Sequence, residues 1–327
     1  MADYLDRIGA GKILVDRSPL SYDWTPSTLV GRDDSLSELA SIFSQIENPD
    51  TSCKAVITGP VGSGKTVLTQ VFGNDLRRHL EGRRKIVHVH VNCRNHPSGP
   101  QVLQQIAISL DERHPERGFS AGEMIQSIKR YLRTHSAHML LVLDEVDVMI
   151  RRDSTDLIYR LLRIDEGQNE RGTMSIILVS QDSSLLRLFE PAIISRLGAS
   201  SRVNLHPYNK TDLLQIARQR AEASCIKGSI GEDVLGKIAR YAAESGDARL
   251  AIELLEAAII RAEKEGRGEV GIEDIHPSKI RSASVEPNQV DDLSEHKKLI
   301  LLAICRRLKK EDMVSSGDAL KLYHVVC

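Results

Sequence analysis

The stretch GPVGSGKT, residues 59–66, constrains the fold of this chain more than any other feature. It follows the apolar run KAVIT (54–58) and precedes apolar residues at helical spacing, at positions 67, 68, 71 and 72. The stretch matches G-x-x-x-x-G-K-[ST] in full, and a place between a strand and a helix is the context that supports a phosphate-binding loop over a chance glycine-rich turn. The chain is therefore expected to be an α/β protein that binds a nucleotide.

Each residue of this loop is expected to take part in binding. Glycines permit backbone conformations with positive φ, so that successive N–H groups can point inward at an anion, and the following helix adds its positive N-terminal end. Lys65 can reach the β- and γ-phosphates, and the hydroxyl of Thr66 can bind Mg²⁺. The predicted nucleotide-binding residues of the loop are Gly59, Pro60, Val61, Gly62, Ser63, Gly64, Lys65 and Thr66.

Strand patterns and helix patterns alternate along the first two thirds of the chain. Continuous apolar runs of strand length, bounded by polar residues, are typical of a parallel sheet that helices cover on both faces. The alternation predicts right-handed βαβ units and a doubly wound sheet. The predicted strands are KAVIT (54–58), KIVHVHV (85–91), MLLVLDE (139–145), MSIILVS (174–180) and SRVNL (201–205).

The strand pattern stops after HPY (206–208), and amphipathic helices follow over 211–226, 231–244 and 247–264. This change of class predicts a domain boundary, and the polar stretch 278–292 has the composition of a linker. The predicted organisation is an N-terminal strap (1–30), a nucleotide-binding base (31–205), an all-α lid (206–277), the linker (278–292) and a last unit (293–327) that opens with a helix over 294–310.

Two carboxylates stand at the end of the run LLVLDE, at Asp144 and Glu145. The carboxyl end of a central parallel strand lies beside the phosphate loop, where Asp144 can hold Mg²⁺ together with Thr66. Glu145 is then placed to orient or deprotonate an attacking water. Because water attack is what a kinase of small metabolites must avoid, the pair favours hydrolysis over transfer to a second substrate. A solvated acidic strand end is the alternative.

His88 and His90 fall on one face of the predicted strand 85–91, because side chains two residues apart point the same way. Such a pair could suggest a metal site. No third ligand lies near them in the sequence, so packed or hydrogen-bonded imidazoles are the favoured interpretation.

Composition bounds the partners of the chain. The 327 residues have a formal net charge of −1 and a sequence pI near 6.8, so any contact with nucleic acid must come from a local basic patch. No run reaches the ~18 apolar residues that a membrane span needs, and no signal-peptide core is present. We expect a cytoplasmic protein without membrane contacts.

With these features in order, the chain resembles the archaeal origin-recognition and cell-division-control initiators, a branch of the AAA+ ATPases. The resemblance extends over nearly the whole chain, and its entry motif and GDARLAI element are fairly specific to this branch. The segments that carry it are PSTLVGRDDSLSEL (26–39), GPVGSGKT, VNC (91–93), LLVLDEVD (140–147), SRLG (195–198), HPY (206–208), GDARLAIELL (246–255) and LSEHKKLILLAI (293–304).

The resemblance implies roles for two arginines. Arg249, near the start of a lid helix, matches the arginine with which the family contacts the γ-phosphate from the lid, the role called sensor 2. Arg196 in SRLG matches the arginine finger that reaches the nucleotide of a neighbouring subunit. A finger supplied in trans is worth ~10³–10⁵ in rate, so an isolated subunit should be a weak Mg²⁺-dependent ATPase. An ordinary surface salt bridge is the alternative for each.

The resemblance also implies an adenine pocket, flanked by Gly31, Arg32 and Tyr208, although a plain structural role for these residues fits equally well. Gln181 occupies or adjoins the position where the family generally places an asparagine that orients the lytic water, and its longer side chain predicts slower hydrolysis. A second departure is the winged-helix domain, of which 293–327 supplies only the beginning.

DNA contacts are expected from two places. The family inserts extra helices between its second and third strands, and the long segment between Lys65 and Asp144 leaves room for them. The last unit adds a dense group of cations, for which solvated helix charges are the alternative. The candidate DNA-binding residues are Arg113, Arg117, Lys297, Lys298, Arg306 and Arg307.

Together these features predict an ATP-dependent DNA replication initiator at the nucleoid. It would bind duplex origin DNA and other initiator subunits, help load the replicative minichromosome-maintenance helicase, and use ATP and ADP with Mg²⁺ as a conformational switch. Two alternatives stay open. One is a regulatory paralogue that acts through protein contacts without binding DNA on its own, and the other is a clamp-loader or transposition-type AAA+ ATPase.

Overall fold

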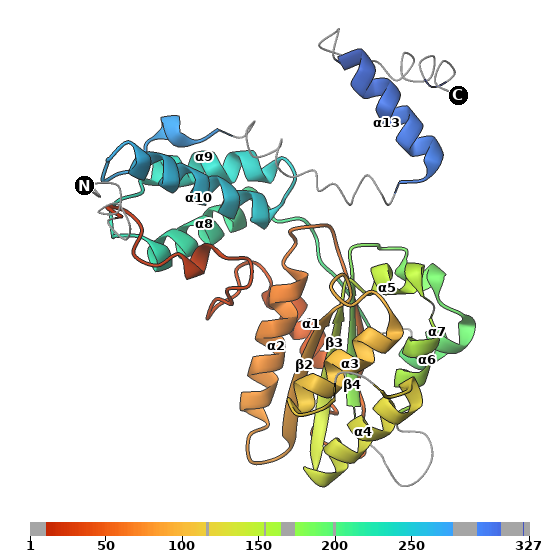
Figure 1. Cartoon of the computed structure of the whole chain (residues 1–327). Coiled ribbons are helices and arrows are strands. Elements are labelled where there is room, and N and C mark those ends of the chain that lie inside the picture. The colour runs from red at the N-terminus through yellow and green to blue at the C-terminus, as the bar shows by residue number, and fades with distance from the viewer. Residues whose placement is uncertain are drawn as a thin grey trace, which may run out of the picture. The chain divides into compact units, whose positions relative to one another are not determined.

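A parallel sheet and a group of helices make up most of the computed structural model (Figure 1). The model describes residues 11–115, 118–153, 155–164, 174–198, 201–276, 293–308 and 323. It divides into two compact units, 1–275 and 276–327. The predicted base and lid both lie in the first unit, so the boundary predicted near residue 206 stays a prediction.

The sheet has five strands in the order β2-β3-β4-β1-β5, and every pair of neighbours is parallel. This confirms the predicted doubly wound α/β fold. All residues of β3 and β4 are buried, as their continuous apolar sequences require. The strands are β1 (Lys54–Thr58), β2 (Lys85–Asn92), β3 (Ala137–Asp144), β4 (Met174–Ser180) and β5 (Arg202–Asn204).

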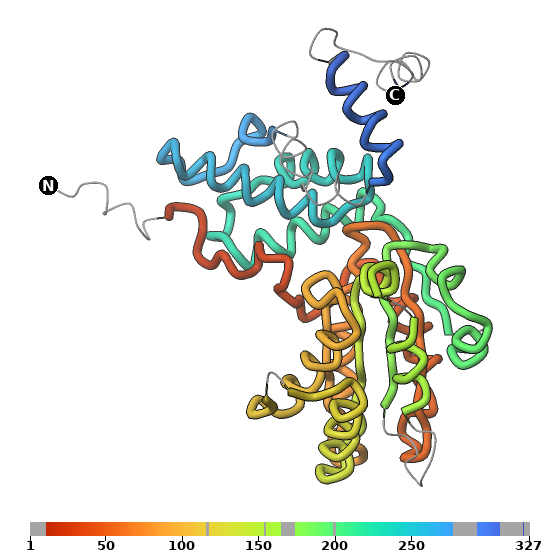
Figure 2. Tube along the Cα trace, turned by 45° about the vertical axis from the view of Figure 1, so that its right-hand side comes forward, coloured from red at the N-terminus to blue at the C-terminus, as the bar shows by residue number. Residues whose placement is uncertain are grey.

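Helices cover both faces of the sheet (Figures 1 and 2). On one face, α1 (Asp33–Ile42) and α2 (Lys65–His79) bury Leu39, Leu68 and Phe72 against Ile57 and its neighbours. The other face has a larger core, which includes Val89, Leu141 and Ile176. Its helices are α3 (Gly99–Leu110), α4 (Ala121–Thr134), α5 (Val146–Arg152), α6 (Asp156–Leu162) and α7 (Pro191–Leu197), with the short 3₁₀ turn η2 (Leu185–Leu188).

The lid contains the predicted helices as α8 (Lys210–Ser224), α9 (Glu232–Ala243) and α10 (Ala248–Lys264), which pack against one another (Figure 1). Their ends lie within two residues of the predicted ends. The side chain of Asn209 caps α8 by accepting from the backbone N–H of Asp212, at 2.9 Å.

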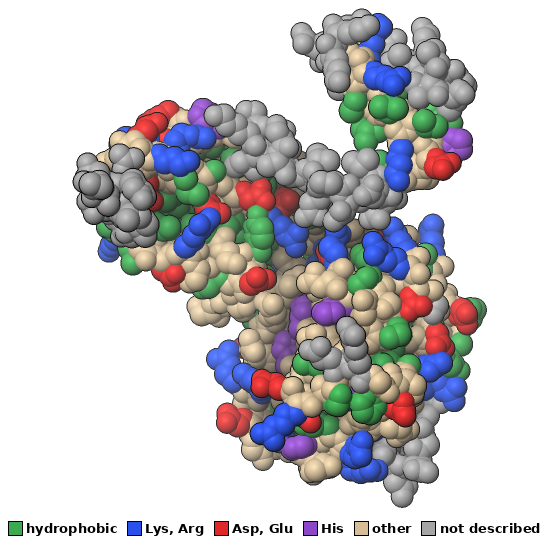
Figure 3. Space-filling view, in the orientation of Figure 1, with side chains coloured by type: hydrophobic (Ala, Val, Ile, Leu, Met, Phe, Trp, Pro, Cys, Tyr) green, Lys and Arg blue, Asp and Glu red, His purple; other side chains and the backbone are tan. Residues whose placement is uncertain are grey.

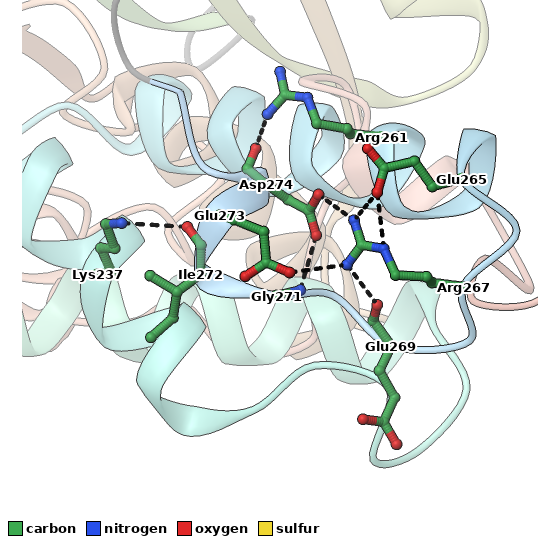
Figure 4. Close-up of polar contacts among 9 residues, drawn as sticks. All are labelled: Lys237, Arg261, Glu265, Arg267, Glu269, Gly271, Ile272, Glu273 and Asp274. Carbon is green, nitrogen blue, oxygen red and sulfur yellow. Dashed lines mark hydrogen bonds and ion pairs between the residues drawn. The ribbon is translucent and has the colours of Figure 1, made fainter.

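A network of hydrogen bonds and ion pairs around Arg267 links the end of α10 to the 3₁₀ turn η3 (Ile272–Asp274) (Figure 4). We call it the Arg267 clasp. The guanidinium donates to the carboxylates of Glu265, Glu273 and Asp274. Arg261 in turn donates to the carbonyl of Asp274, whose side chain is only 1% exposed.

The predicted strap runs along the lid helices from residue 11 onward and contains the 3₁₀ turn η1 (Ser18–Leu20). The backbone N–H groups of Ile13 and Leu14 donate to one carboxylate oxygen of Glu263, and the buried Arg220 donates to the carbonyls of Pro19 and Ser21. Residues 1–10 lie outside the described part.

The second unit is described as α13 (Glu295–Leu308), which agrees with the start of the predicted last helix, and as residue 323. The predicted linker (278–292) and most of the remaining winged-helix segment lie outside the described residues. Among the helices that the structure describes, none has the length and apolar character needed to cross a membrane.

Candidate functional site

The loop 59–66 joins β1 to α2, as the sequence pattern predicts, and α2 begins at Lys65. Gly62 and Gly64 have φ of 71° and 82°, a region that favours glycine. Close packing restricts both positions as well. A Cβ on Gly62 would lie 1.7 Å from a carboxylate oxygen of Asp247, and one on Gly64 would lie 2.5 Å from the hydroxyl of Tyr208.

Lys65 is buried and donates to the carbonyl oxygens of Gly59 and Pro60, at 2.8 and 2.7 Å. Burial lowers the pKa of its ammonium; the charge of Asp144 opposes that shift, whereas Arg249 adds to it. The hydrogen bonds of the Lys65 ammonium thus go to neutral carbonyl groups, and an anionic ligand can replace them.

Asp144 ends β3 and is 1% exposed. The hydroxyl of Thr66 donates to its Oδ2 at 2.6 Å, and the backbone N–H of Glu145 donates to Oδ1 at 2.9 Å. Burial alone would raise the pKa of this carboxyl, but hydrogen bonds from His90 and Thr66 outweigh it, and the pKa is lowered. An ionised carboxylate beside a hydroxyl is an oxygen donor set that fits Mg²⁺.

Glu145 does not belong to the strand, which corrects the predicted span 139–145. It adopts a left-handed conformation with φ of 51° and begins the turn into α5. The guanidinium of Arg94 donates from Nε to its Oε2 at 2.7 Å. No sequence motif includes Arg94, although its place just after VNC puts it at the end of the neighbouring strand β2.

A second residue that the motifs missed is His90. Its Nε2 lies 3.4 Å from Oδ2 of Asp144. The sequence favoured packed or hydrogen-bonded imidazoles over a metal pair at His88 and His90, and the ring of His88 packs on Gly73.

Gln181 is exposed and directly follows β4. The preceding Ser180 is buried and donates to Asp147 at 2.6 Å, and the parallel register pairs it with Thr58, the last residue before the phosphate loop. The backbone therefore brings Gln181 to the same sheet edge as the loop. Its predicted role in orienting water stays a prediction.

The lid meets the phosphate loop at the N-terminus of α10. The side chain of Asp247 caps this helix by accepting from the N–H of Arg249 at 2.8 Å. The N–H of Ala248 donates to the carbonyl of Gly62 at 3.1 Å. The guanidinium of Arg249 lies over the ring of Tyr22, 5.7 Å from its centroid, and close enough to Lys65 to lower the pKa of that lysine.

Arg32 and Tyr208 contact the phosphate loop at Ser63 and Gly64. The guanidinium lies 3.7 Å from the centroid of the Tyr208 ring, and it donates to the carbonyls of Ser63 and His206. Gly31, with φ of 62°, leads into this pair. These contacts give the three predicted residues a structural role; whether they also contact adenine stays a prediction.

The remaining predicted residues come from other elements of the chain. Arg196 is in the last turn of α7, with its guanidinium 5.6 Å from the centroid of the Tyr159 ring. Arg113 follows α3, and its backbone N–H donates to Asp111. Arg117 lies outside the described residues. The other candidates for DNA contact are on α13 in the second unit: Lys297, Lys298, Arg306 and Arg307.

Comparison with known proteins places this geometry in a family. Residues 53–189 match the family model of the AAA domain, and residues 214–279 match that of the Cdc6 AAA+ ATPase-type lid domain. The ORC1-type DNA replication protein 1 of Sulfolobus acidocaldarius is 28% identical over 329 residues, which cover 99% of this chain and 82% of that protein.

Two solved structures extend the likeness to the fold. Cdc6p from Pyrobaculum aerophilum is 27% identical, with a TM-score of 0.72 over 96% of this chain and 84% of that one. The Aeropyrum pernix ORC1 protein, solved in complex with DNA, is also 27% identical, with a TM-score of 0.76 over 96% and 82% of the two chains.

Proposed function

Because this chain belongs to the archaeal Cdc6/ORC1-type family of AAA+ ATPases, we propose that it is an ATP-dependent initiator of DNA replication. It binds duplex origin DNA and helps load the replicative minichromosome-maintenance helicase. ATP acts as a conformational switch, which slow hydrolysis resets.

One observation carries the switch: the lid helix α10 touches the phosphate loop directly. The hydrogen bond from Ala248 to Gly62 and the close approach of Asp247 couple the position of α10 to the conformation of the loop. A phosphate that binds in the loop can therefore change the position of the lid. Since Arg249 is on the first turn of the same helix, a γ-phosphate can attract it and fix the lid at a new angle.

The residues of the loop divide the work of binding. Lys65 exchanges its bonds to two loop carbonyls for bonds to phosphate oxygens, which are stronger because they join opposite charges. Thr66 and Asp144 would hold Mg²⁺ through their oxygens. When bound, this ion neutralises phosphate charge.

Hydrolysis needs a base, and Glu145 is the candidate. As a base it accepts a proton from the attacking water, but in the structure its carboxylate is paired with Arg94. The ion pair holds the side chain in one orientation, and hydrolysis waits for it to open. Gln181 would orient the water, and Arg196 would act on the nucleotide of a neighbouring initiator subunit.

DNA binding is proposed from the relatives and from local charge. The Aeropyrum pernix ORC1 protein was solved with DNA, and this chain follows its fold over most of its length. On the face seen in Figure 3, Lys and Arg side chains gather at the edge of the base near α5. Exposed Arg151 and Arg152 are in the last turn of that helix. Such an edge can contact phosphates. Arg113, Arg117 and the cations of the last unit stay separate predictions for DNA contact.

The test measures binding of duplex DNA by fluorescence anisotropy across a salt series, with ATP or ADP present. Origin DNA and a shuffled duplex of equal length are compared, and a Lys65→Ala variant serves as the control with weakened nucleotide binding. We expect tighter binding to origin DNA that depends on the nucleotide and on Lys65. Equal affinity for both duplexes in every nucleotide state would argue for the regulatory paralogue instead.

A further inference from the structure

His88 and His90 fill the space between β2 and the phosphate-loop helix α2. The ring of His88 packs on Gly73, where an added Cβ would lie only 2.5 Å from a ring carbon. The ring of His90 lies 6.4 Å from that of His88, closer to the end of the strand, and its side chain is 20% exposed. The two residues thus share a strand and a face.

They differ in their polar contacts. Nε2 of His90 is 3.4 Å from Oδ2 of Asp144, the same oxygen that accepts from Thr66 at 2.6 Å. Within the described residues, Nδ1 of His90 and Nε2 of His88 are buried without a hydrogen-bond partner. The ring of His90 therefore directs Nε2 at the carboxylate of Asp144, whereas the ring of His88 does not contact that carboxylate.

We propose that His90 is a positioning residue, which holds the carboxylate of Asp144 in the orientation that presents an oxygen to Mg²⁺ beside Thr66. This inference rests on the proposed function, since it needs a nucleotide–Mg²⁺ complex. The physical reason is general: a carboxylate that binds a metal must be held in one rotamer, and the groups that hold it typically contribute 10–100-fold to metal affinity.

The geometry explains why a histidine suits this place. β2 pairs with β3 in a register that sets His90 beside Val142 and Asn92 beside Asp144, so a side chain at 90 must reach along the strand to meet the carboxylate. An imidazole ring spans that gap, and in the tautomer with a proton on Nε2 it can donate to the carboxylate. Aliphatic side chains fill the same space but leave Oδ2 of Asp144 without this second contact.

Two variants of nearly equal shape isolate the contact. His90→Gln keeps an N–H donor at the end of the side chain, and His90→Met replaces it with an apolar group of similar length. His88→Met is the matched control on the same face of the same strand. Circular dichroism and thermal melts check that each variant folds; if H90M does not, the pair His90→Asn and His90→Leu repeats the comparison.

Calorimetry measures ADP binding over a series of Mg²⁺ concentrations and in EDTA. We expect H90M to need about ten times more Mg²⁺ than the wild type to reach half of the Mg²⁺-dependent increase in ADP affinity. For H90Q this Mg²⁺ concentration should lie within about threefold of the wild type. H88M should match the wild type, and binding in EDTA should be the same for all four proteins.

Two results would overturn the inference: an H90M curve that coincides with the wild type, or an H88M curve shifted as far as that of H90M, which would assign the effect to packing. Failure of the wild type to bind ADP at any Mg²⁺ concentration would instead contradict the proposed function. The two failures are therefore distinguishable in one experiment.

Discussion

The phosphate loop and the Arg267 clasp both gather charged side chains, but they pair them differently. In the clasp one cation meets three carboxylates, and the buried carboxylate of Asp274 also accepts from the N–H of Gly271 at 2.8 Å (Figure 4). At the loop, the buried Lys65 meets only carbonyl oxygens. The clasp is complete in itself, whereas the loop keeps a positive charge that no carboxylate hydrogen-bonds.

This difference separates charges that stabilise the fold from charges that await a ligand. Partners within the chain can satisfy a buried ion fully, and the structure then has no need of another molecule. Contacts to neutral carbonyl groups can be exchanged for contacts to phosphate at a gain. Variants in the two regions should therefore have opposite signatures: loss of ligand chemistry at the loop, and loss of stability at the clasp.

The largest effect is expected for Glu145→Gln. The amide keeps the size of the side chain but cannot accept a proton from water, so kcat for ATP hydrolysis should fall about 10³-fold. Affinity for ATP and the melting temperature should stay near those of the wild type. Steady-state phosphate release measures kcat; an unchanged rate would remove Glu145 from the reaction and leave the loop as a binding site alone.

Lys65→Ala comes next. Loss of two charge-assisted hydrogen bonds to phosphate should weaken nucleotide binding about 100-fold by calorimetry. The matched control is Arg267→Ala, which removes a cation from the clasp; it should melt earlier and bind nucleotide as the wild type does. If R267A lost nucleotide affinity as K65A does, the proposed separation of the two regions would be wrong.

Much of the base could be predicted because its strands are buried on both faces. Long apolar runs such as MSIILVS leave little choice, and the predicted span 174–180 is the observed one. The sequence pattern does not predict α5, α6 and α7, because seven residues make too few turns for a helical period to appear.

The contacts that tune the site escaped prediction for a different reason. The pairs His90–Asp144 and Arg94–Glu145 depend on the register between β2 and β3, and a shift of one residue would turn each side chain to the other face. The approach of Asp247 to Gly62 depends on how the lid helix meets the loop. Motifs identify the residues of a site, whereas tertiary packing decides which of them touch.

Asp274→Asn tests the clasp from its buried side. The amide loses the ionic bond to Arg267, and the free energy of unfolding should fall by about 2 kcal/mol in urea titrations at pH 7. Glu273→Gln, which removes a 73% exposed partner of the same arginine, should change it by less than about 0.5 kcal/mol.

The contribution of Asp274 to the free energy of unfolding should depend on pH. Burial would raise the pKa of Asp274, but the hydrogen bond from Arg267 outweighs it and the pKa lies below its ordinary value. The folded state therefore gains stability from this group above about pH 4, and the gain is lost as the pH falls through the folded pKa. The difference in the free energy of unfolding between wild type and D274N should narrow as the pH falls below about 4, measured by urea titrations at intervals of about one pH unit. A constant gap would show that shape, not charge, holds the clasp.

The smallest effect is expected for Arg94→Ala, which tests the ion pair between Arg94 and Glu145 at the nucleotide site. Removal of this partly exposed ion pair frees Glu145, and a pair of this kind is worth up to about 1 kcal/mol. Single-turnover hydrolysis should therefore rise about threefold, within the fivefold limit that about 1 kcal/mol sets. Arg151→Ala, which breaks the 2.7 Å pair with Asp182 at the same sheet edge, is the control and should leave the rate unchanged. If R94A slowed hydrolysis instead, Arg94 would assist the reaction rather than restrain Glu145.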